Sequence, residues 1–119
     1  MMNLIGIESD DTVGIKIDGK IRDEDFEAVT SLLEEKIEKH SKVNVYVELE
    51  SLGAMSPQTV LKDLKFVAKY KNQINKEAIV TEKDWVEKLT SAADKVFNDI
   101  DMQTFSFDEK DQAKNWVQN

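Results

Sequence analysis

The spacing of apolar residues changes several times along this chain, and those changes limit the folds that it can adopt. Val13, Ile15 and Ile17 alternate with polar residues, which is the two-residue period of a strand with one buried face. From residue 23 the spacing lengthens to three and four, as in an amphipathic helix. The apolar positions of this first helix are Phe26, Val29, Leu33 and Ile37.

The same alternation of strand and helix continues to the end of the chain. The expected strands cover 4–7, 12–18, 43–50, 78–80 and 102–107, and the expected helices cover 23–40, 57–70, 82–97 and 108–117. Thr81 and Asp108 are the residues expected to cap the third and fourth helices. The order ββαβαβαβα predicts an α/β sandwich with a mostly parallel sheet, an antiparallel N-terminal edge strand and helices packed on it. No linker or repeat interrupts the pattern, so residues 1–119 are expected to form a single domain.

Composition excludes several classes of function. The chain has no cysteine and one histidine, which excludes disulfides and thiolate metal sites and fits a reducing cytoplasm. Its net charge is −8 and Arg22 is its single arginine, so nucleic acid is not an expected partner. The N-terminus lacks the features of a signal peptide, and no stretch is apolar enough for an integral membrane segment.

Charge is unevenly distributed, and the middle of the chain is basic. Residues 51–81 hold five basic and two acidic side chains, whereas residues 1–50 hold 13 acidic and six basic ones. Within the predicted second helix, Lys62, Lys65 and Lys69 form one face, with Phe66 and Tyr70 beside it. This face is the candidate surface for an acidic partner or an anionic headgroup, and the alternative is an ordinary solvated helix face.

Other charged residues lie where chemistry could occur. Glu48 and Glu50 share one face at the carboxyl end of a central strand, where ligands of open α/β sheets often bind. A pair of carboxylates held by lysines is the favoured interpretation, because the sole histidine, His40, belongs to the end of the first helix and completes no site. The four glycines match no phosphate-binding loop. We therefore expect no catalytic set, metal site or cofactor.

Four short runs share their order and spacing with a known family. They are Asp18-Gly19-Lys20-Ile21, Val47-Glu48-Leu49-Glu50, Asp63-Leu64-Lys65-Phe66, and Ala78-Ile79-Val80 followed by Lys83-Asp84-Trp85. Together they make nearly the whole chain resemble the SpoIIAA-like family of single-domain bacterial proteins. That resemblance implies a STAS-like fold with similarity to CRAL-TRIO domains.

The resemblance also suggests where regulation would occur. STAS antagonists of anti-sigma factors are switched by phosphorylation of a serine or threonine in an Asp-Ser pair that follows the central strand. The corresponding stretch here contains Ser51 and Ser56, but it lacks the Asp-Ser pair. Ser56 precedes Pro57, so helix capping is its favoured role and phosphorylation is the alternative.

These observations favour a non-enzymatic cytoplasmic module that acts in bacterial regulation through protein–protein contacts. The alternative is a carrier of a small apolar or lipid-like ligand, as the similarity to CRAL-TRIO folds implies. Met55, Phe66 and Phe97 are apolar residues available to line such a site. A homodimer formed through an exposed helix face or the edge strand stays open.

Overall fold

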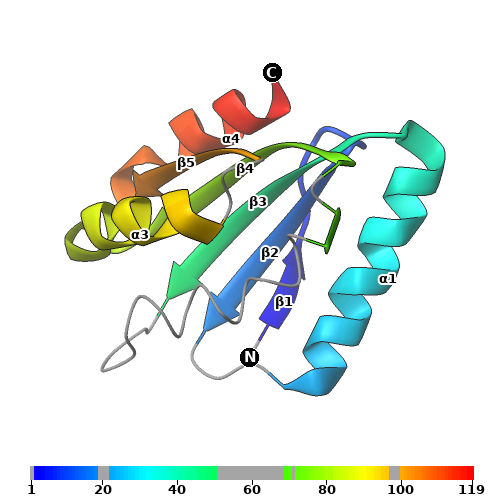
Figure 1. Cartoon of the computed structure of the whole chain (residues 1–119), viewed down its shortest axis with the longest axis horizontal. Helices are drawn as coiled ribbons and strands as arrows, with labels where there is room; N and C mark the ends of the chain where they lie inside the picture. Colours follow the sequence, from blue (N-terminus) through cyan, green and yellow to red (C-terminus); the bar gives the residue numbers. More distant parts are fainter. Residues whose placement is uncertain (1, 19–21, 51–68, 71, 97–99) are drawn as a thin grey trace.

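The structure is a computed structural model, and it describes residues 2–18, 22–50, 69–70, 72–96 and 100–119. Its strands are β1 (Met2–Ile5), β2 (Thr12–Asp18), β3 (Val43–Glu50), β4 (Ile74–Thr81) and β5 (Asp101–Ser106). Its helices are α1 (Asp23–His40), α3 (Lys83–Val96) and α4 (Lys110–Gln118), with a short 3₁₀ helix, η2 (Phe107–Glu109), before α4. The strands form one sheet in the order β1-β2-β3-β4-β5 (Figure 1). Strands β2 to β5 are parallel and β1 is antiparallel to β2, which confirms the predicted class of fold.

Helix α1 begins and ends where the sequence predicts. Three acidic residues, Asp23 to Asp25, occupy its first turn, where they interact favourably with the partial positive charge of the helix N-terminus. The backbone N–H of Arg22 donates to Oδ2 of Asp25 at 3.0 Å. At the other end the N–H of Ser41 donates to the carbonyl of Ile37, and the positive φ of Ser41, 67°, turns the chain out of the helix.

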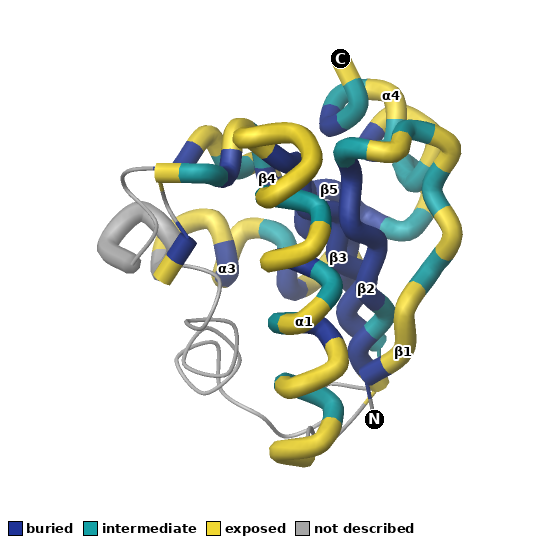
Figure 2. Tube along the Cα trace, turned by 90° about the vertical axis from the view of Figure 1, so that its right-hand side faces the viewer, coloured by how far each residue is buried: buried dark blue, intermediate teal, exposed yellow. Residues whose placement is uncertain are grey.

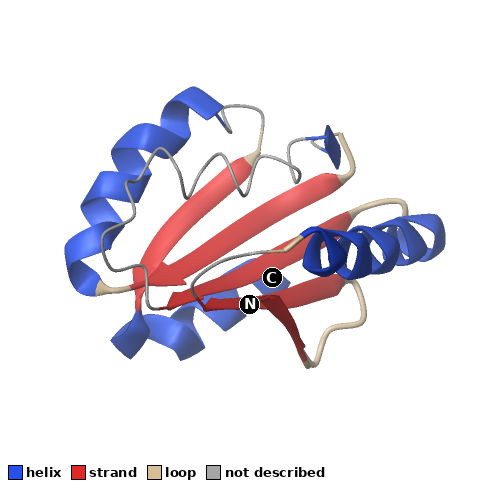
Figure 3. Ribbon diagram, turned by 90° about the horizontal axis from the view of Figure 1, so that it is seen from below, coloured by secondary structure: helices blue, strands red, loops and turns tan. Residues whose placement is uncertain are grey.

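The sheet separates two apolar cores. Helices α1 and α3 cover one face, where Val29, Leu33 and Leu89 pack against strand residues such as Ile15 and Val47. Helix α4 covers the other face, where Ala113 and Val117 pack against Tyr46 and other strand residues. Figure 3 shows helices on both sides of the sheet, and Figure 2 shows that its central strands are buried. Since both faces of these strands are covered, polar residues in them are enclosed as well.

Several predicted boundaries are wrong. Strand β4 begins at Ile74 and includes the polar residues before the apolar run 78–80. Thr81 does not cap a helix, because it is the last residue of β4 and Glu82 separates it from α3. Ser106 rather than Asp108 is the cap at this end of the chain, and it caps the 3₁₀ helix η2 that leads into α4. The N–H of Ser106 donates to Oε1 of Glu109 at 2.9 Å, as in a capping box.

Most of the predicted second helix lies outside the described residues. The same holds for Ser51, Ser56, Lys62, Lys65 and Phe66, and for Met55 and Phe97. Of the predicted lysine face, the structure describes Lys69 and Tyr70. In the described part of the chain, no helix is both long enough and apolar enough to cross a lipid bilayer.

Candidate functional site

The carboxylates at the end of β3 are held by lysines, as the sequence predicts. Glu50 lies 3.6 Å from Nζ of Lys16 on β2, and Glu48 lies 3.5 Å from Nζ of Lys110 on α4. Glu48 is buried, and its Oε2 also accepts a hydrogen bond of 2.7 Å from the hydroxyl of Tyr46. Burial, reinforced by this bond to Glu48, raises the pKa of Tyr46 well above its usual range. Because one carboxylate oxygen of Glu48 is paired with Lys110 and the other with Tyr46, Glu48 joins β3 to α4 and has a structural role.

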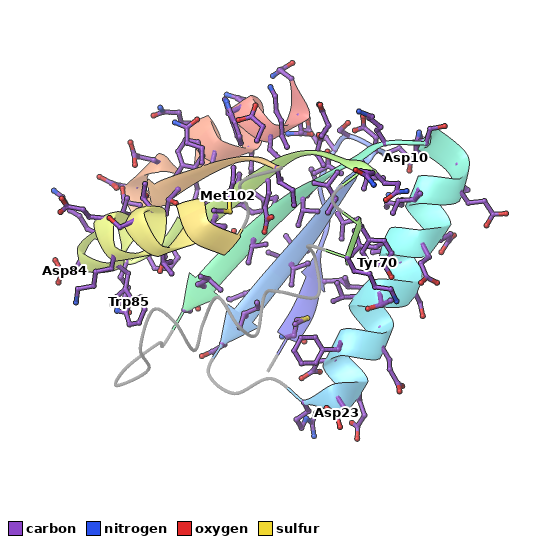
Figure 4. The ribbon with its side chains drawn as sticks, in the orientation of Figure 1. Asp10, Asp23, Tyr70, Asp84, Trp85 and Met102 are labelled. Carbon is purple, nitrogen blue, oxygen red and sulfur yellow. The ribbon has the colours of Figure 1, made fainter. Side chains whose placement is uncertain are left out.

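The end of the predicted lysine face is packed against α1. The hydroxyl of Tyr70 donates to Oε1 of Glu34 at 2.8 Å, and Figure 4 shows Tyr70 facing that helix. Burial, together with this bond, raises the pKa of Tyr70. Lys69 is exposed, with its Nζ 5.7 Å from the centre of the Tyr70 ring. The structure therefore presents Lys69 to solvent and places Tyr70 beneath it.

His40 lies at the last residue of α1, as predicted, and it has a partner that the sequence analysis missed. Its Nε2 is 2.9 Å from Oδ2 of Asp10, in the connection between β1 and β2. Lys36 contacts the same carboxylate at 3.5 Å and donates to the Asp10 carbonyl. The hydrogen bond from His40, followed by the charge of Lys36, lowers the pKa of Asp10. This group fastens the β1–β2 connection to the end of α1 (Figure 4).

Glu77 is the polar residue with the most unusual surroundings, and the sequence analysis did not select it. It lies in β4, its side chain is 0% exposed, and neither carboxylate oxygen has a hydrogen-bond partner in the described structure. Its neighbours across the sheet are Val45 on β3 and Met102 on β5, both apolar. Burial raises the pKa of Glu77 from 4.5 to about 8. The side chain is therefore mostly uncharged at neutral pH.

Thr81 repeats this arrangement further along the same strand. Its Oγ1 is buried and also lacks a hydrogen-bond partner among the residues described. Residues 77, 79 and 81 point to the same side of β4, and Ile79 places that side in the core covered by α1 and α3. Buried polar atoms are usually paired, so two unpaired groups on one face are a candidate polar lining for a ligand.

The described residues do not support a metal centre. Among them, no group of three or more histidine and acidic side chains is placed to hold a metal ion. The two tryptophans, Trp85 and Trp116, lie on opposite faces of the sheet. Trp85 belongs to the core under α1 and α3, and the ring centre of Trp116 is 5.9 Å from that of Phe105 in the other core.

The fold is that of a small α/β module of the STAS type, with a mostly parallel sheet, helices on both faces and an antiparallel edge strand. A comparison with family models gives the more specific assignment: the SpoIIAA-like model matches residues 12–118. The chain belongs to the SpoIIAA-like family. Searches of curated proteins and of solved structures gave no match.

Proposed function

We propose that this SpoIIAA-like protein is a non-enzymatic module of the bacterial cytoplasm that binds an acidic protein partner. The observation that carries the proposal is the basic character of residues 51–81. This segment holds five lysines and two acidic residues, and one of those acids is Glu77. Because Glu77 is buried and mostly uncharged at neutral pH, the segment is more basic than its composition indicates.

The contact residues in this proposal are those of the lysine face. Lys62, Lys65, Phe66 and Lys69 contact the partner, and Tyr70 supports Lys69 from beneath through its bond to Glu34. A phosphate on Ser51 or Ser56 would add negative charge to the same segment and would weaken this contact. The partner is therefore expected to prefer the unphosphorylated protein.

Charge reversal tests this proposal. The double variant Lys62→Glu/Lys65→Glu should bind the partner about tenfold or more weakly, and wild-type binding should weaken between 50 and 300 mM NaCl. Lys88→Glu is the matched control, because Lys88 is an exposed lysine on α3. Partners captured by cross-linking are purified, and their affinity for each variant is measured by biolayer interferometry. Equal affinity for the wild-type protein and the double variant would contradict the proposal.

A second function, as carrier of a small apolar ligand similar to those of CRAL-TRIO domains, is favoured by a separate observation. Glu77 and Thr81 present unpaired polar atoms on the apolar face of β4 under α1 and α3. Their Cα atoms are about 13 Å apart, at four residues along a strand. A slender amphiphile lying along β4 could pair its polar groups with both side chains.

Native mass spectrometry of the purified protein distinguishes the two functions. A carrier should show a reproducible mass increment that disappears on denaturation and is reduced in the Glu77→Leu and Thr81→Val variants. Absence of any increment would reject the carrier function and would leave the protein-binding proposal intact. The circular dichroism spectra of both variants report whether the fold is preserved.

A further inference from the structure

Strand β1 forms one edge of the sheet, and its sequence lacks the residues that usually protect an edge. In the described structure it pairs on one side only, with β2. Edge strands are commonly protected by charged side chains, proline or a covering element. Residues 2–7, Met-Asn-Leu-Ile-Gly-Ile, contain neither a charged residue nor a proline. Among the residues that the structure describes, none pairs with the outer backbone groups of β1, so these groups can pair with another strand.

A large apolar side chain is exposed on this strand. Leu4 is 49% exposed, although it is paired with Ile15, which is fully buried. Because directly paired residues point to the same side of a sheet, Leu4 lies on the face that α1 and α3 cover. Helix α1 packs on β1, β2 and β3 and lies alongside this edge (Figure 2). A further strand paired with β1, together with a helix packed on that strand, would bury Leu4 next to α1.

Charge indicates what can occupy this edge. Strand β1 has no charged side chain, so an acidic segment would find no basic partner on it. A basic segment would find no carboxylate on β1 itself. An uncharged strand fits best, and the β1 strand of a second copy has this character. Antiparallel pairing of two identical strands also satisfies two-fold symmetry, the usual symmetry of homodimers.

We propose that β1 is an interface with a second copy of this chain, in which two β1 strands pair antiparallel about Leu4. The pairing would join two five-stranded sheets into one of ten strands, with the two Leu4 side chains buried between the α1 helices. This inference is independent of the lysine face. A four-residue strand buries less than the roughly 1,000 Å² of a stable interface, so the dimer is weak. Its dissociation constant is expected to lie between about 10 μM and 1 mM.

Sedimentation equilibrium up to 1 mM tests the interface. The wild-type protein should show a monomer–dimer equilibrium, and Leu4→Lys should weaken it at least tenfold by placing two like charges together. The control is Asn75→Lys, which adds the same charge at an exposed position of β4. A protein that is monomeric at 1 mM, or a dimer that Leu4→Lys leaves unchanged, would overturn the proposal.

Disulfide trapping gives a second measurement. The chain has no cysteine, so Leu4→Cys introduces a single thiol, and Asn75→Cys is its control. Residues directly opposite in an antiparallel pair have Cα atoms about 4.5–5.5 Å apart, within the range of a disulfide. Under mild oxidation Leu4→Cys should form a covalent dimer at least tenfold faster than Asn75→Cys. Equal rates would overturn the pairing about Leu4.

Discussion

Glu77→Gln is expected to stabilise the protein at neutral pH, by an amount that depends on pH. Glutamine has nearly the size of glutamate and stays uncharged, so it imitates the protonated side chain. In the folded protein burial raises the pKa of Glu77 from 4.5 to about 8. Between these values the folded protein retains a proton that the unfolded chain releases. Rising pH therefore favours the unfolded state of the wild-type protein, and the glutamine variant does not share this loss.

The magnitude follows from the two pKa values. Each unit of difference corresponds to about 1.4 kcal/mol, and nearly all of the interval between 4.5 and 7 contributes at pH 7. The difference in free energy of unfolding between the variant and the wild-type protein should thus increase by roughly 3 kcal/mol from pH 4 to pH 7, in favour of the variant. The gain should continue to about pH 8 and then level off. Any fixed difference in packing between the two side chains is the same at every pH.

Urea unfolding followed by circular dichroism at pH 4, 5, 6, 7 and 8 measures this difference. Subtracting the two proteins at each pH removes the contributions of the other titrating groups. Glu82→Gln is the matched control, because Glu82 directly follows β4 and is exposed to solvent. A difference between Glu77→Gln and the wild-type protein that stays constant from pH 4 to pH 8 would refute the reasoning.

Two further substitutions test contacts within the sheet. Tyr46→Phe removes the hydroxyl that donates to buried Glu48, and it should lower the free energy of unfolding by about 1–3 kcal/mol, measured by urea unfolding. Gly14→Ala would place a methyl group 2.6 Å from the carbonyl oxygen of Ile5 and should destabilise the protein by about 1–3 kcal/mol. The same assay measures the second variant, and an unchanged midpoint would show that β1 moves aside without cost.

The order of the described elements and the directions of the strands were predictable because both follow from local periodicity. The three-four spacing from Phe26 to Ile37 and the acidic start at Asp23 both describe the same helix, which the structure contains with those ends. The antiparallel position of β1 follows from its short connection to β2. Parallel pairing of the other strands follows from the helices expected between them.

Glu77 was missed because local periodicity says little about a central strand. Both faces of β4 are covered, so Glu77 is enclosed as fully as Ile79. An irregularity in the pairing of β3 with β4, between Val43 and Val45, also places Ile74 and Glu77 on one face although they are three residues apart. A two-residue alternation in the sequence therefore does not predict which face of β4 each residue occupies.

Contacts between distant parts of the chain also could not be predicted from the spacing of residues in the sequence. His40 and Asp10 are 30 residues apart, and they meet because the β1–β2 connection reaches the end of α1. Thr81 and Ser106 are both hydroxyl residues shortly before a helix, yet only Ser106 acts as a cap. Thr81 ends β4 and is buried, whereas the N–H of Ser106 bonds to the acid three residues later. The capping rule applies only once the end of the strand is known.

The division of the interior into two cores has a consequence for how the protein unfolds. Neither layer of helices can separate from the sheet without exposing an entire apolar face of it to water. Helix α4, with nine residues, is too short to persist alone, and its order depends on strands that α1 and α3 hold in place from the other side. Because the two cores share one sheet, each core depends on the other. A substitution that loosens the packing of one layer of helices therefore destabilises both cores.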